Sequence, residues 1–186
     1  VIRFEASPLG DLDVQAAWAR AFGPDPARRV HGVVALHACD TATCDALALG
    51  VALGSTLLAV APCCQAELAR GWSKLGATST DGEALTPRTG EHAAFASVWR
   101  TPHLRRELGA NVTDTMRVLL LRAAGYDTTA MEFVPVEHTR KNTLIRALHR
   151  GAPDAAARAE YEALVASTGG VGLALAARLG EGARGG

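Results

Sequence analysis

Apolar residues in the first part of the chain follow two different periods. Residues 1–5 alternate apolar and polar side chains, which predicts a short strand that ends at Ser7-Pro8. Residues 11–22 place apolar side chains at helical spacing, which predicts a short helix. The run from Gly32 to Leu36 is apolar throughout, so we expect a buried strand in the middle of a parallel sheet.

After this run the pattern continues as helix, strand and helix. The first of these helices should begin at Asp40 or Thr41 and end before Gly54, a residue suited to a helix end. Residues 55–61 form the second expected strand, and residues 65–75 form the helix after it. This spacing is typical of right-handed βαβ units and predicts an α/β fold with a parallel sheet.

The second half begins with a polar stretch and a long helical region. Residues 77–90 are rich in Thr, Ser, Gly and Asp, which predicts an exposed loop. Residues 91–124 show helical periodicity, with breaks expected at Thr101-Pro102 and at Gly109. Two strand candidates follow, and because the loop between them is too short for a crossover helix, they should pair antiparallel: residues 128–134 and 143–148.

The end of the chain changes in composition. Residues 154–165 predict a helix, and the Gly-, Ala- and Arg-rich remainder is expected to be a loose tail. The chain has 186 residues, of which 48% are hydrophobic, enough for one sizeable core but too few for two ordinary domains. We therefore expect one domain over residues 1–150 and a helix with a flexible tail over residues 151–186.

Charge and cysteine usage narrow the classes of function. Lys plus Arg equals Asp plus Glu at 19 each, so no overall field draws the chain to nucleic acid or to a membrane surface. The longest apolar run, residues 51–64, is interrupted and is shorter than the roughly 20 residues that a bilayer requires. No charged region followed by an apolar stretch opens the sequence, so we expect a cytoplasmic protein with reduced thiols.

Four segments together resemble one family of class I S-adenosylmethionine-dependent methyltransferases: LHACDTATCDAL (36–47), APCCQAEL (61–68), VTDTMRVLLLRAAGY (112–126) and EFVPVEHTRKNTLIRA (132–147). The family includes the eukaryotic glutathione S-transferase C-terminal-domain-containing protein and is more distantly similar to a tRNA 2′-O-methyltransferase. The resemblance implies a Rossmann-like sheet, mostly parallel with an antiparallel terminal strand pair, and S-adenosyl-L-methionine as cofactor. It also implies RNA or another macromolecule as the methyl acceptor.

The resemblance also implies that this chain is the C-terminal portion of its methyltransferase domain. In the family, a Gly-rich loop after the first strand and an acid after the second strand hold the cofactor, and both should precede Val1. N-terminal strands are therefore expected to be missing, and residues 1–150 to be a partial domain. The late cluster Gly169-Gly170-Val171-Gly172 follows a helix rather than a strand, so we predict a flexible terminus there instead of a cofactor loop.

Two segments are expected to contact the cofactor. Ser7, Pro8 and Leu9 follow the first expected strand, where the resemblance places a loop against the adenine ring; an ordinary turn after a strand would explain them equally well. His37 and Ala38 follow the next strand, where the resemblance places residues that face the methyl-bearing sulfonium. In open α/β sheets, ligands bind beyond the carboxyl ends of the strands.

His37, Cys39 and Asp40 are the first candidates for chemistry. A sulfonium donor is already activated, so the enzyme has to align the acceptor and remove its proton. Asp40 can orient or deprotonate an acceptor, and His37 can share that work because an imidazole takes up protons near neutral pH. Alternatively, Asp40 only caps the helix that follows it.

Pro62, Cys63 and Cys64 end the second strand and should lie beside Cys39. The cysteines can be structural, as small residues at a crowded edge. Alternatively, Cys63 or Cys64 attacks a pyrimidine ring as a thiolate while Cys39 assists release, by analogy with RNA 5-methylcytosine enzymes. A helix N-terminus beginning at Gln65 would favour the thiolate form.

A third interpretation is a zinc site made by the three cysteines with His37 or His138. Adjacent cysteines are poorly spaced for one tetrahedral ion compared with CxxC. We therefore predict no metal ligands from the sequence and keep a zinc or thiol protein as an alternative function.

His138, Lys141 and Asn142 lie on the loop between the last two strands, in a segment that recurs in the resembling family. With Pro62 they are the candidates for binding substrate, through a phosphate or a carboxylate. Alternatively, Asn and Thr side chains hold this loop in shape. Several arginines give the long helical region a basic bias that can contact RNA or form a solvated helix face: Arg100, Arg105, Arg106, Arg117 and Arg122.

The function predicted from the sequence is therefore a methyltransferase acting on RNA or another macromolecule. A different class, a non-catalytic fragment or binding module that lacks the cofactor's Gly-rich loop, remains open. The zinc or thiol protein is the third possibility.

Overall fold

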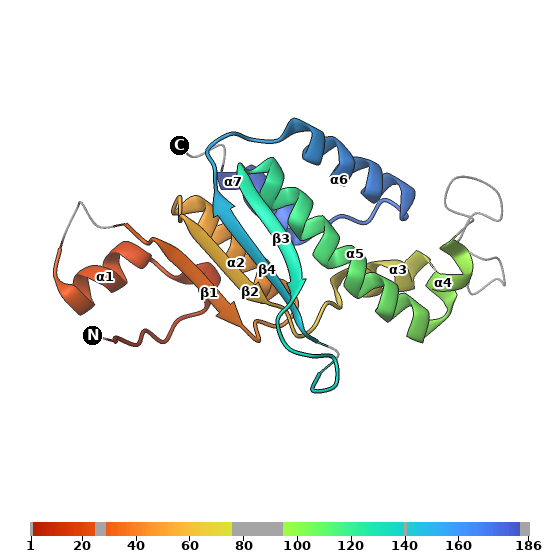
Figure 1. Cartoon of the computed structure of the whole chain (residues 1–186), viewed down its shortest axis with the longest axis horizontal. Coiled ribbons are helices and arrows are strands. Elements are labelled where there is room, and N and C mark those ends of the chain that lie inside the picture. The colour runs from red at the N-terminus through yellow and green to blue at the C-terminus, as the bar shows by residue number, and fades with distance from the viewer. Residues whose placement is uncertain (1, 25–28, 76–94, 140, 183–186) are drawn as a thin grey trace.

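The described part of the chain is an α/β structure built around one mixed sheet (Figure 1). A computed structural model describes residues 2–24, 29–75, 95–139 and 141–182. Within these residues, four strands form a sheet in the order β1-β2-β4-β3. The strands are β1 (Gly32–Leu36), β2 (Leu57–Ala61), β3 (Tyr126–Glu132) and β4 (Thr143–His149).

Helices connect and cover the strands. They are the 3-10 helix η1 (Leu9–Asp11) and the α-helices α1 (Val14–Phe22), α2 (Thr41–Ala52), α3 (Glu67–Leu75), α4 (Ala96–Arg100), α5 (Pro102–Ala123), α6 (Ala155–Ser167) and α7 (Ala174–Gly182). Asp13 and Asp154 accept backbone hydrogen bonds within the first turns of α1 and α6 and cap those helices. Pro102 begins α5, at a position where its missing N–H costs nothing.

The strand pairing decides where the loops meet. β1 and β2 are parallel, with Gly32 opposite Leu57 and Leu36 opposite Ala61. Their carboxyl ends therefore lie side by side, and the loops that begin at residues 37 and 62 leave the sheet at the same edge. β4 pairs antiparallel with both β2 and β3, so it separates the parallel pair from β3.

Helices cover one face of the sheet. Leu58 and Ile145 are completely buried on this face, where they belong to one hydrophobic core with Leu47 of α2 and Met116 of α5. In Figure 1, α2 and α7 lie behind the strands. On the opposite face, Val34 and Leu36 point away from the core, and their exposed fractions are 64% and 61% among the described residues.

Three expectations about the sheet are wrong for the described residues. Residues 2–5 form no strand, because no described strand pairs with them, and Val1 lies outside the described residues. The strand Gly32–Leu36 is confirmed, but it lies at the edge of the described sheet rather than in its middle. The sheet is also not mostly parallel, since β1–β2 is its one parallel pair and β4 pairs antiparallel on both sides.

The long helical region is broken once among its described residues. Thr101 separates α4 from α5, as expected, whereas α5 continues through Gly109. A Cβ at Gly109 would lie 3.3 Å from the backbone nitrogen of Ala69, so this glycine lets α3 and α5 pack closely rather than ending a helix. The loop expected at residues 77–90 lies outside the described residues.

The prediction of a loose tail after the sixth α-helix is wrong for the residues described there. Leu173 and Leu175 are buried, and α7 packs against α2. The N–H of Ala174 donates to Glu67 Oε1 at 2.6 Å, and Arg178 pairs with Asp45 at 2.7 Å. These contacts fix a segment whose composition alone resembles a flexible terminus. The division of the chain at residue 150 stays a prediction.

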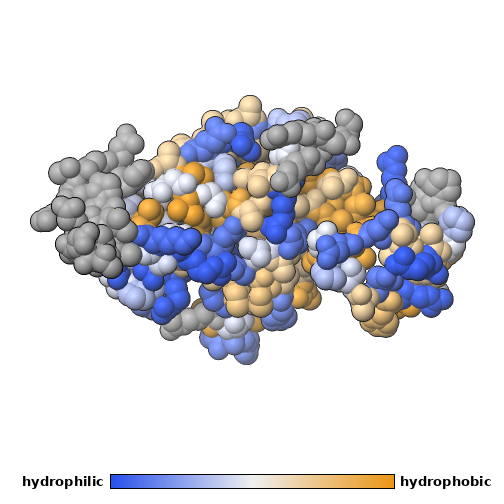
Figure 2. Space-filling model, turned by 180° about the vertical axis from the view of Figure 1, so that it is seen from behind, coloured by the Kyte–Doolittle hydropathy of each residue, from blue (hydrophilic) through white to orange (hydrophobic). Residues whose placement is uncertain are grey.

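The helix side of the molecule, seen in Figure 2, mixes hydrophilic surface with apolar patches. Of the helices that the structure describes, none is long and apolar enough to cross a membrane.

Candidate functional site

Two loops meet at the carboxyl end of the parallel strand pair. The N–H of His37 donates to the carbonyl of Ala61 at 3.2 Å and extends the strand pairing by one residue. The N–H of Asp40 donates to the carbonyl of Cys64 at 3.0 Å. The loop after β1 and the loop after β2 are therefore joined by backbone hydrogen bonds, and the side chains of both project at one edge of the sheet.

Asp40 holds this junction with its carboxylate. Its Oδ1 accepts a hydrogen bond from the N–H of Ala66 at 3.0 Å, and its Oδ2 forms an ion pair with Arg70 of α3. Asp40 occupies the N-cap position of α2, as one interpretation of the sequence expected, but its side chain makes no capping hydrogen bond to that helix. Because both oxygens have partners on the neighbouring loop and helix, Asp40 positions the edge of the sheet.

The backbone of the first loop is strained at two residues that are not glycine. His37 has a φ of 60° and Asp40 a φ of 53° with ψ of −116°. Side chains disfavour these conformations, which persist when surrounding contacts hold them. The hydrogen bonds of His37 and Asp40 to the second loop supply such contacts. The result is a turn that presents Cys39 at the surface.

The structure brings Cys39, Cys63 and Cys64 together. The Sγ atoms of Cys39 and Cys63 lie 3.1 Å apart, and all three Sγ atoms lie within 4.8 Å of one another. Cys39 and Cys64 are exposed, and Cys63 is half-buried. Hydrogen bonds from Cys39 to the thiols of Cys63 and Cys64, with the repulsion between thiolates, raise the pKa of Cys39 to about 12. In this arrangement Cys39 is a thiol near neutral pH.

Of two neighbouring buried residues of α2, Thr43 contacts the loop after β1. The hydroxyl of Thr43 donates to the carbonyl of Ala38 and is completely buried. Cys44 is also completely buried, and burial raises the pKa of its thiol, with the nearby Arg117 guanidinium acting in the opposite direction. Cys44 therefore belongs to the interior and is separate from the exposed thiols.

A buried chain of polar groups lies beneath the two loops. Arg117 is completely buried and donates to Asp114 Oδ1 at 2.9 Å and to the carbonyl of Asp40 at 2.8 Å. Gln65 donates from Nε2 to Asp114 Oδ2 at 2.8 Å. Burial raises the pKa of Asp114, and the Arg117 charge and the Gln65 hydrogen bond oppose that rise. This network connects α5 to both loops of the site.

Contacts within the protein engage three of the five arginines that give the helical region its basic bias. Arg117 is buried, which contradicts both an RNA contact and a solvated face for this residue. Arg122 forms an ion pair with Asp154, and Arg105 donates to the carbonyl of Trp99. Arg100 and Arg106 remain exposed.

The loop between β3 and β4 reaches the same edge through one contact. Lys141 donates from Nζ to Gln65 Oε1 at 3.4 Å. Asn142 is buried and donates to the carbonyl of Val134 at 3.0 Å, while the N–H of Lys141 donates to the Thr139 hydroxyl. The prediction that Asn and Thr side chains shape this loop is therefore confirmed. The side chain of His138 is exposed and makes no contact with the cysteines among the described residues.

The segment expected against the adenine ring lies beside α2. Its 3-10 helix η1, which includes Leu9, contacts α2, and Ser7 donates to the carbonyl of Pro8 at 3.1 Å. No hydrogen bond among the described residues joins Ser7 or Pro8 to His37. A cofactor role for each of the two segments stays a prediction.

Sequence reasoning missed the residues that support the site. Gln65, Arg70, Asp114 and Arg117 hold Asp40 or one another. None of them was predicted to support this edge, and Arg117 was considered only as an RNA contact or as part of a solvated helix face. One signal was present in the sequence: an aspartate and an arginine three residues apart interrupt the apolar face of the long helix. A charged pair in that position is more consistent with a buried partner than with a solvated face.

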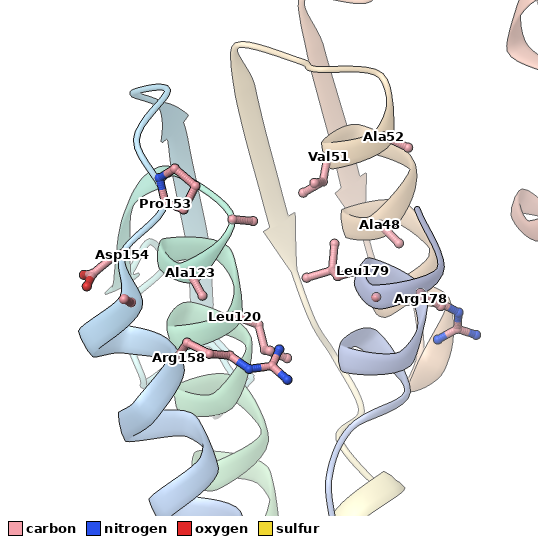
Figure 3. A pocket seen from close by; sticks show the side chains of 13 residues that line it. Ala48, Val51, Ala52, Leu120, Ala123, Pro153, Asp154, Arg158, Arg178 and Leu179 are labelled. Atoms are coloured by element: carbon pink, nitrogen blue, oxygen red, sulfur yellow. The ribbon is translucent and has the colours of Figure 1, made fainter. Parts of the chain in front are cut away.

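A cavity of about 930 Å³ lies away from this edge (Figure 3). It is lined by the end of α2, the end of α5 and the start of α6, and by α7, where Leu179 points toward it. The end of α2 leads into the amino end of β2, so this cavity lies at the opposite end of the strands from Cys39. Its two arginines have partners, since Arg178 pairs with Asp45 and Arg158 with Glu162.

A family model described as a methyltransferase domain matches residues 10–71. The matched stretch contains both parallel strands and the two loops that meet at their carboxyl ends. The match supports a methyltransferase family, as the resemblance of the HACD and PCC segments implied, and leaves the subfamily open. No curated protein and no solved structure matches the chain.

Proposed function

We propose that the chain belongs to an S-adenosyl-L-methionine-dependent methyltransferase whose acceptor site is the carboxyl edge of β1 and β2. One observation carries this proposal: the loops that present His37, Cys39, Asp40 and Cys63 meet at that edge, within the stretch that matches a methyltransferase domain. In α/β sheets this edge is where ligands bind, because the connecting segments diverge there.

The residues of this edge take different roles in the proposal. S-adenosyl-L-methionine supplies a methyl group that is already activated by a sulfonium, so the protein has to place the acceptor and accept its proton. His37 is exposed and makes no side-chain hydrogen bond or ion pair among the described residues, so its imidazole is accessible to that proton. Asp40, whose carboxylate is engaged by Ala66 and Arg70, is the positioning residue.

The cofactor is proposed to lie against Ser7, Pro8 and Leu9 on one side and His37 and Ala38 on the other. The second group fits a ligand because the turn at His37 leaves its side chain exposed and Ala38 half-buried at the strand end. For the first group, the contact of η1 with α2 places it beside the helix that begins at the site.

RNA or another macromolecule is the proposed acceptor. The chain has no net charge, so a nucleic acid would have to be held by a local group of donors. Lys141 and His138 are exposed on the loop that reaches Gln65, and a lysine ammonium suits a phosphate. Pro62 and Asn142 are buried, so their contribution is to fix the two loops that would receive the substrate.

The first experiment is a calorimetric titration with S-adenosylhomocysteine. The titration is made on the chain and on a polypeptide that adds any natural upstream sequence. Saturable binding by either polypeptide supports the proposal, and binding by neither overturns it. His37→Ala should weaken binding or transfer, whereas His31→Ala should not, because His31 is an exposed histidine that precedes the opposite end of β1.

A second experiment identifies the acceptor class. Cofactor labelled in its methyl group is incubated with a polypeptide that binds S-adenosylhomocysteine, together with cell RNA and protein fractions. Label that ribonuclease releases supports RNA, and label that protease releases supports a protein acceptor. Incorporation of label into neither fraction would contradict a macromolecular substrate.

A further inference from the structure

Three thiols from two loops lie within bonding range of a single ion. Their Sγ atoms are all within 4.8 Å of one another. Among the described residues, this is the one group of three or more His, Cys, Asp or Glu side chains that could hold a metal ion. A tetrahedral zinc ion with Zn–S bonds of about 2.3 Å requires sulfur atoms about 3.8 Å apart. The 3.1 Å between Cys39 and Cys63 therefore has to open by roughly 0.7 Å, which rotation about the side-chain bonds can supply.

The adjacent cysteines are less unfavourable than their spacing suggests. Cys63 lies at a bend between β2 and α3, so the side chains of Cys63 and Cys64 do not alternate as they would in a strand. The third thiol is that of Cys39, which belongs to the loop after β1. The fold thus supplies by topology what a CxxC segment supplies by local spacing.

The backbone around the thiols is fixed before any ion binds. The N–H of Asp40 donates to the carbonyl of Cys64, and the Asp40 carboxylate holds the N–H of Ala66 on the far side of the pair. Arg117 holds the carbonyl of Asp40 from beneath. Such outer contacts orient the residues that bind a metal and raise its affinity.

The spacing of the three sulfur atoms suits a cation. Three thiolates within 4.8 Å of one another would repel one another. A divalent cation removes the repulsion and replaces the protons. The N-termini of α2 and α3 follow Cys39 and Cys64 closely in the chain, and their dipoles further stabilise sulfur anions at this edge.

We propose that Cys39, Cys63 and Cys64 bind one Zn²⁺ ion through their sulfur atoms, with the fourth coordination position open to solvent. Thiolate ligands select zinc among the common divalent cations. No histidine or carboxylate joins the group among the described residues, and Cys39 and Cys64 are exposed, so water takes the fourth position. Three protein ligands with one open position are the arrangement of catalytic rather than structural zinc sites.

The protons released and the charge of the occupied site follow from the three thiol ligands. Each thiol that binds the ion loses one proton to solvent, so the complete site releases three protons and carries a net charge of −1 before water is counted. No electron transfer is involved. The site is independent of the proposed methyl transfer, because the three thiols bind the ion whether or not a cofactor is present.

The test is metal titration of the reduced, metal-free chain. Zn²⁺ should bind with a stoichiometry of one, and titration in buffers of different ionisation enthalpy should show about three protons released per ion at neutral pH. Co²⁺ in place of Zn²⁺ should give the absorption bands of a tetrahedral thiolate site. Zn²⁺ should abolish the Co²⁺ bands by displacement.

The variants assign the ligands. Cys39→Ser, Cys63→Ser and Cys64→Ser should each weaken binding by ~100-fold or more and remove thiolate-to-cobalt absorption. Cys44→Ala is the matched control, because Cys44 is buried outside the cluster, and it should bind as the parent does. Far-ultraviolet circular dichroism of each variant verifies that the fold is kept.

Three results would overturn the proposal. These are no stoichiometric uptake by the reduced chain, uptake that Cys39→Ser leaves unchanged, and formation of a Cys39–Cys63 disulfide as the only reaction of the cluster. The calorimetric test with S-adenosylhomocysteine can fail without affecting this result, and metal binding can fail without affecting that test.

Discussion

The carboxylate of Asp40 accepts a hydrogen bond from the backbone N–H of Ala66 at 3.0 Å and thereby joins the loop after β1 to the start of α3. Arg70 holds the other oxygen of the same carboxylate. The residue that looked most like a general base in the sequence is thus occupied in joining two loops. Its influence on chemistry would act through the positions of its neighbours.

Asp40→Asn and Asp40→Ala separate these two roles. Asn keeps an oxygen that can accept from Ala66, whereas Ala removes both contacts. We expect Asp40→Ala to lower the free energy of unfolding by about 1–2 kcal/mol and Asp40→Asn by less than about 1 kcal/mol, measured by urea denaturation.

The same two variants test catalysis. If Asp40 acts by position, Asp40→Asn should restore most of the methyl transfer that Asp40→Ala loses, and the pH profile should keep its shape. An Asn variant as inactive as the Ala variant, in a protein that remains folded, would contradict the positioning role and indicate a proton acceptor.

Breaking the buried ion pair between Asp114 and Arg117 should cause a larger loss of stability. Arg117→Met removes the partner of a carboxylate that is 8% exposed, so the unfolding free energy should fall by about 3–5 kcal/mol in urea denaturation. Arg106→Met is the control, because Arg106 is exposed on the same helix, and it should change stability by less than about 0.5 kcal/mol. Adding Asp114→Leu to Arg117→Met should recover part of the loss; no recovery would contradict an uncompensated charge as the cause.

The stability loss of Arg117→Met should depend on pH. Burial already raises the pKa of Asp114, and Arg117 is the charge that opposes this rise, so its removal raises the folded-state pKa further. A carboxyl group with a raised folded pKa stabilises the fold when protonated, and this stability is lost as pH rises. The difference between parent and variant should therefore be smaller at pH 5 than at pH 7.

Periodicity predicted the elements that lie along the core. The strands at 32–36 and 143–149 and the helix at 41–52 have continuous apolar or helical patterns, which depend on local sequence. The edge position of β1 could not be predicted in this way, because the number of strands beside it is not encoded in its own residues. Nor could the insertion of β4 between β2 and β3, a choice between two partners of similar character.

In the candidate site too, the features that follow from local sequence were predicted and those that depend on distant contacts were missed. Cys39 and Cys63 were expected to be neighbours because the carboxyl ends of parallel strands share one edge, and the structure places them in contact. The support from Arg117 was missed because it depends on which face of α5 meets the sheet. Similarly, α7 is held by Glu67 and Asp45, residues more than a hundred positions away, so no local pattern could reveal it.

The thiol of Cys39 should react slowly with alkylating reagents. Hydrogen bonds to Cys63 and Cys64 raise its pKa to about 12, so at pH 8 it is almost entirely protonated, and the thiolate is the reactive form. Iodoacetamide labelling of metal-free protein, followed by peptide mass spectrometry, should show Cys39 labelled at least about tenfold more slowly than in the Cys63→Ser/Cys64→Ser variant. Equal rates would show that the neighbouring thiols do not control Cys39.

The segment between α6 and α7 packs closely against α3 and α4 at Gly169. This residue has a φ of 95°, and a Cβ there would lie 2.5 Å from Leu75 Cδ1 and 3.0 Å from a ring carbon of Trp99. Gly169→Ala should lower the unfolding free energy by about 2–4 kcal/mol in urea denaturation, from backbone strain and from crowding. Gly151→Ala isolates the strain alone, since Gly151 has a φ of 89° with nothing near its Cβ position, and it should cost about 1 kcal/mol. Equal losses would mean that Gly169 does not pack against Leu75 and Trp99 as described.

The N-cap of α6 predicts a pH-dependent stability. The N–H of Ala157 donates to Asp154 at 3.0 Å, and this bond, with the ion pair to Arg122, holds the pKa of Asp154 below its ordinary value of 3.8. A depressed carboxyl pKa stabilises the fold above the unfolded value, and this stability is lost as pH falls through the folded value. Asp154→Ala should lower Tm by about 2–4 °C at pH 7, and the difference should shrink below about pH 4, measured by differential scanning calorimetry. Asp154→Asn keeps a capping oxygen and should lose less at pH 7; a Tm difference that stays constant down to pH 3 would show that the charge of Asp154 is not involved.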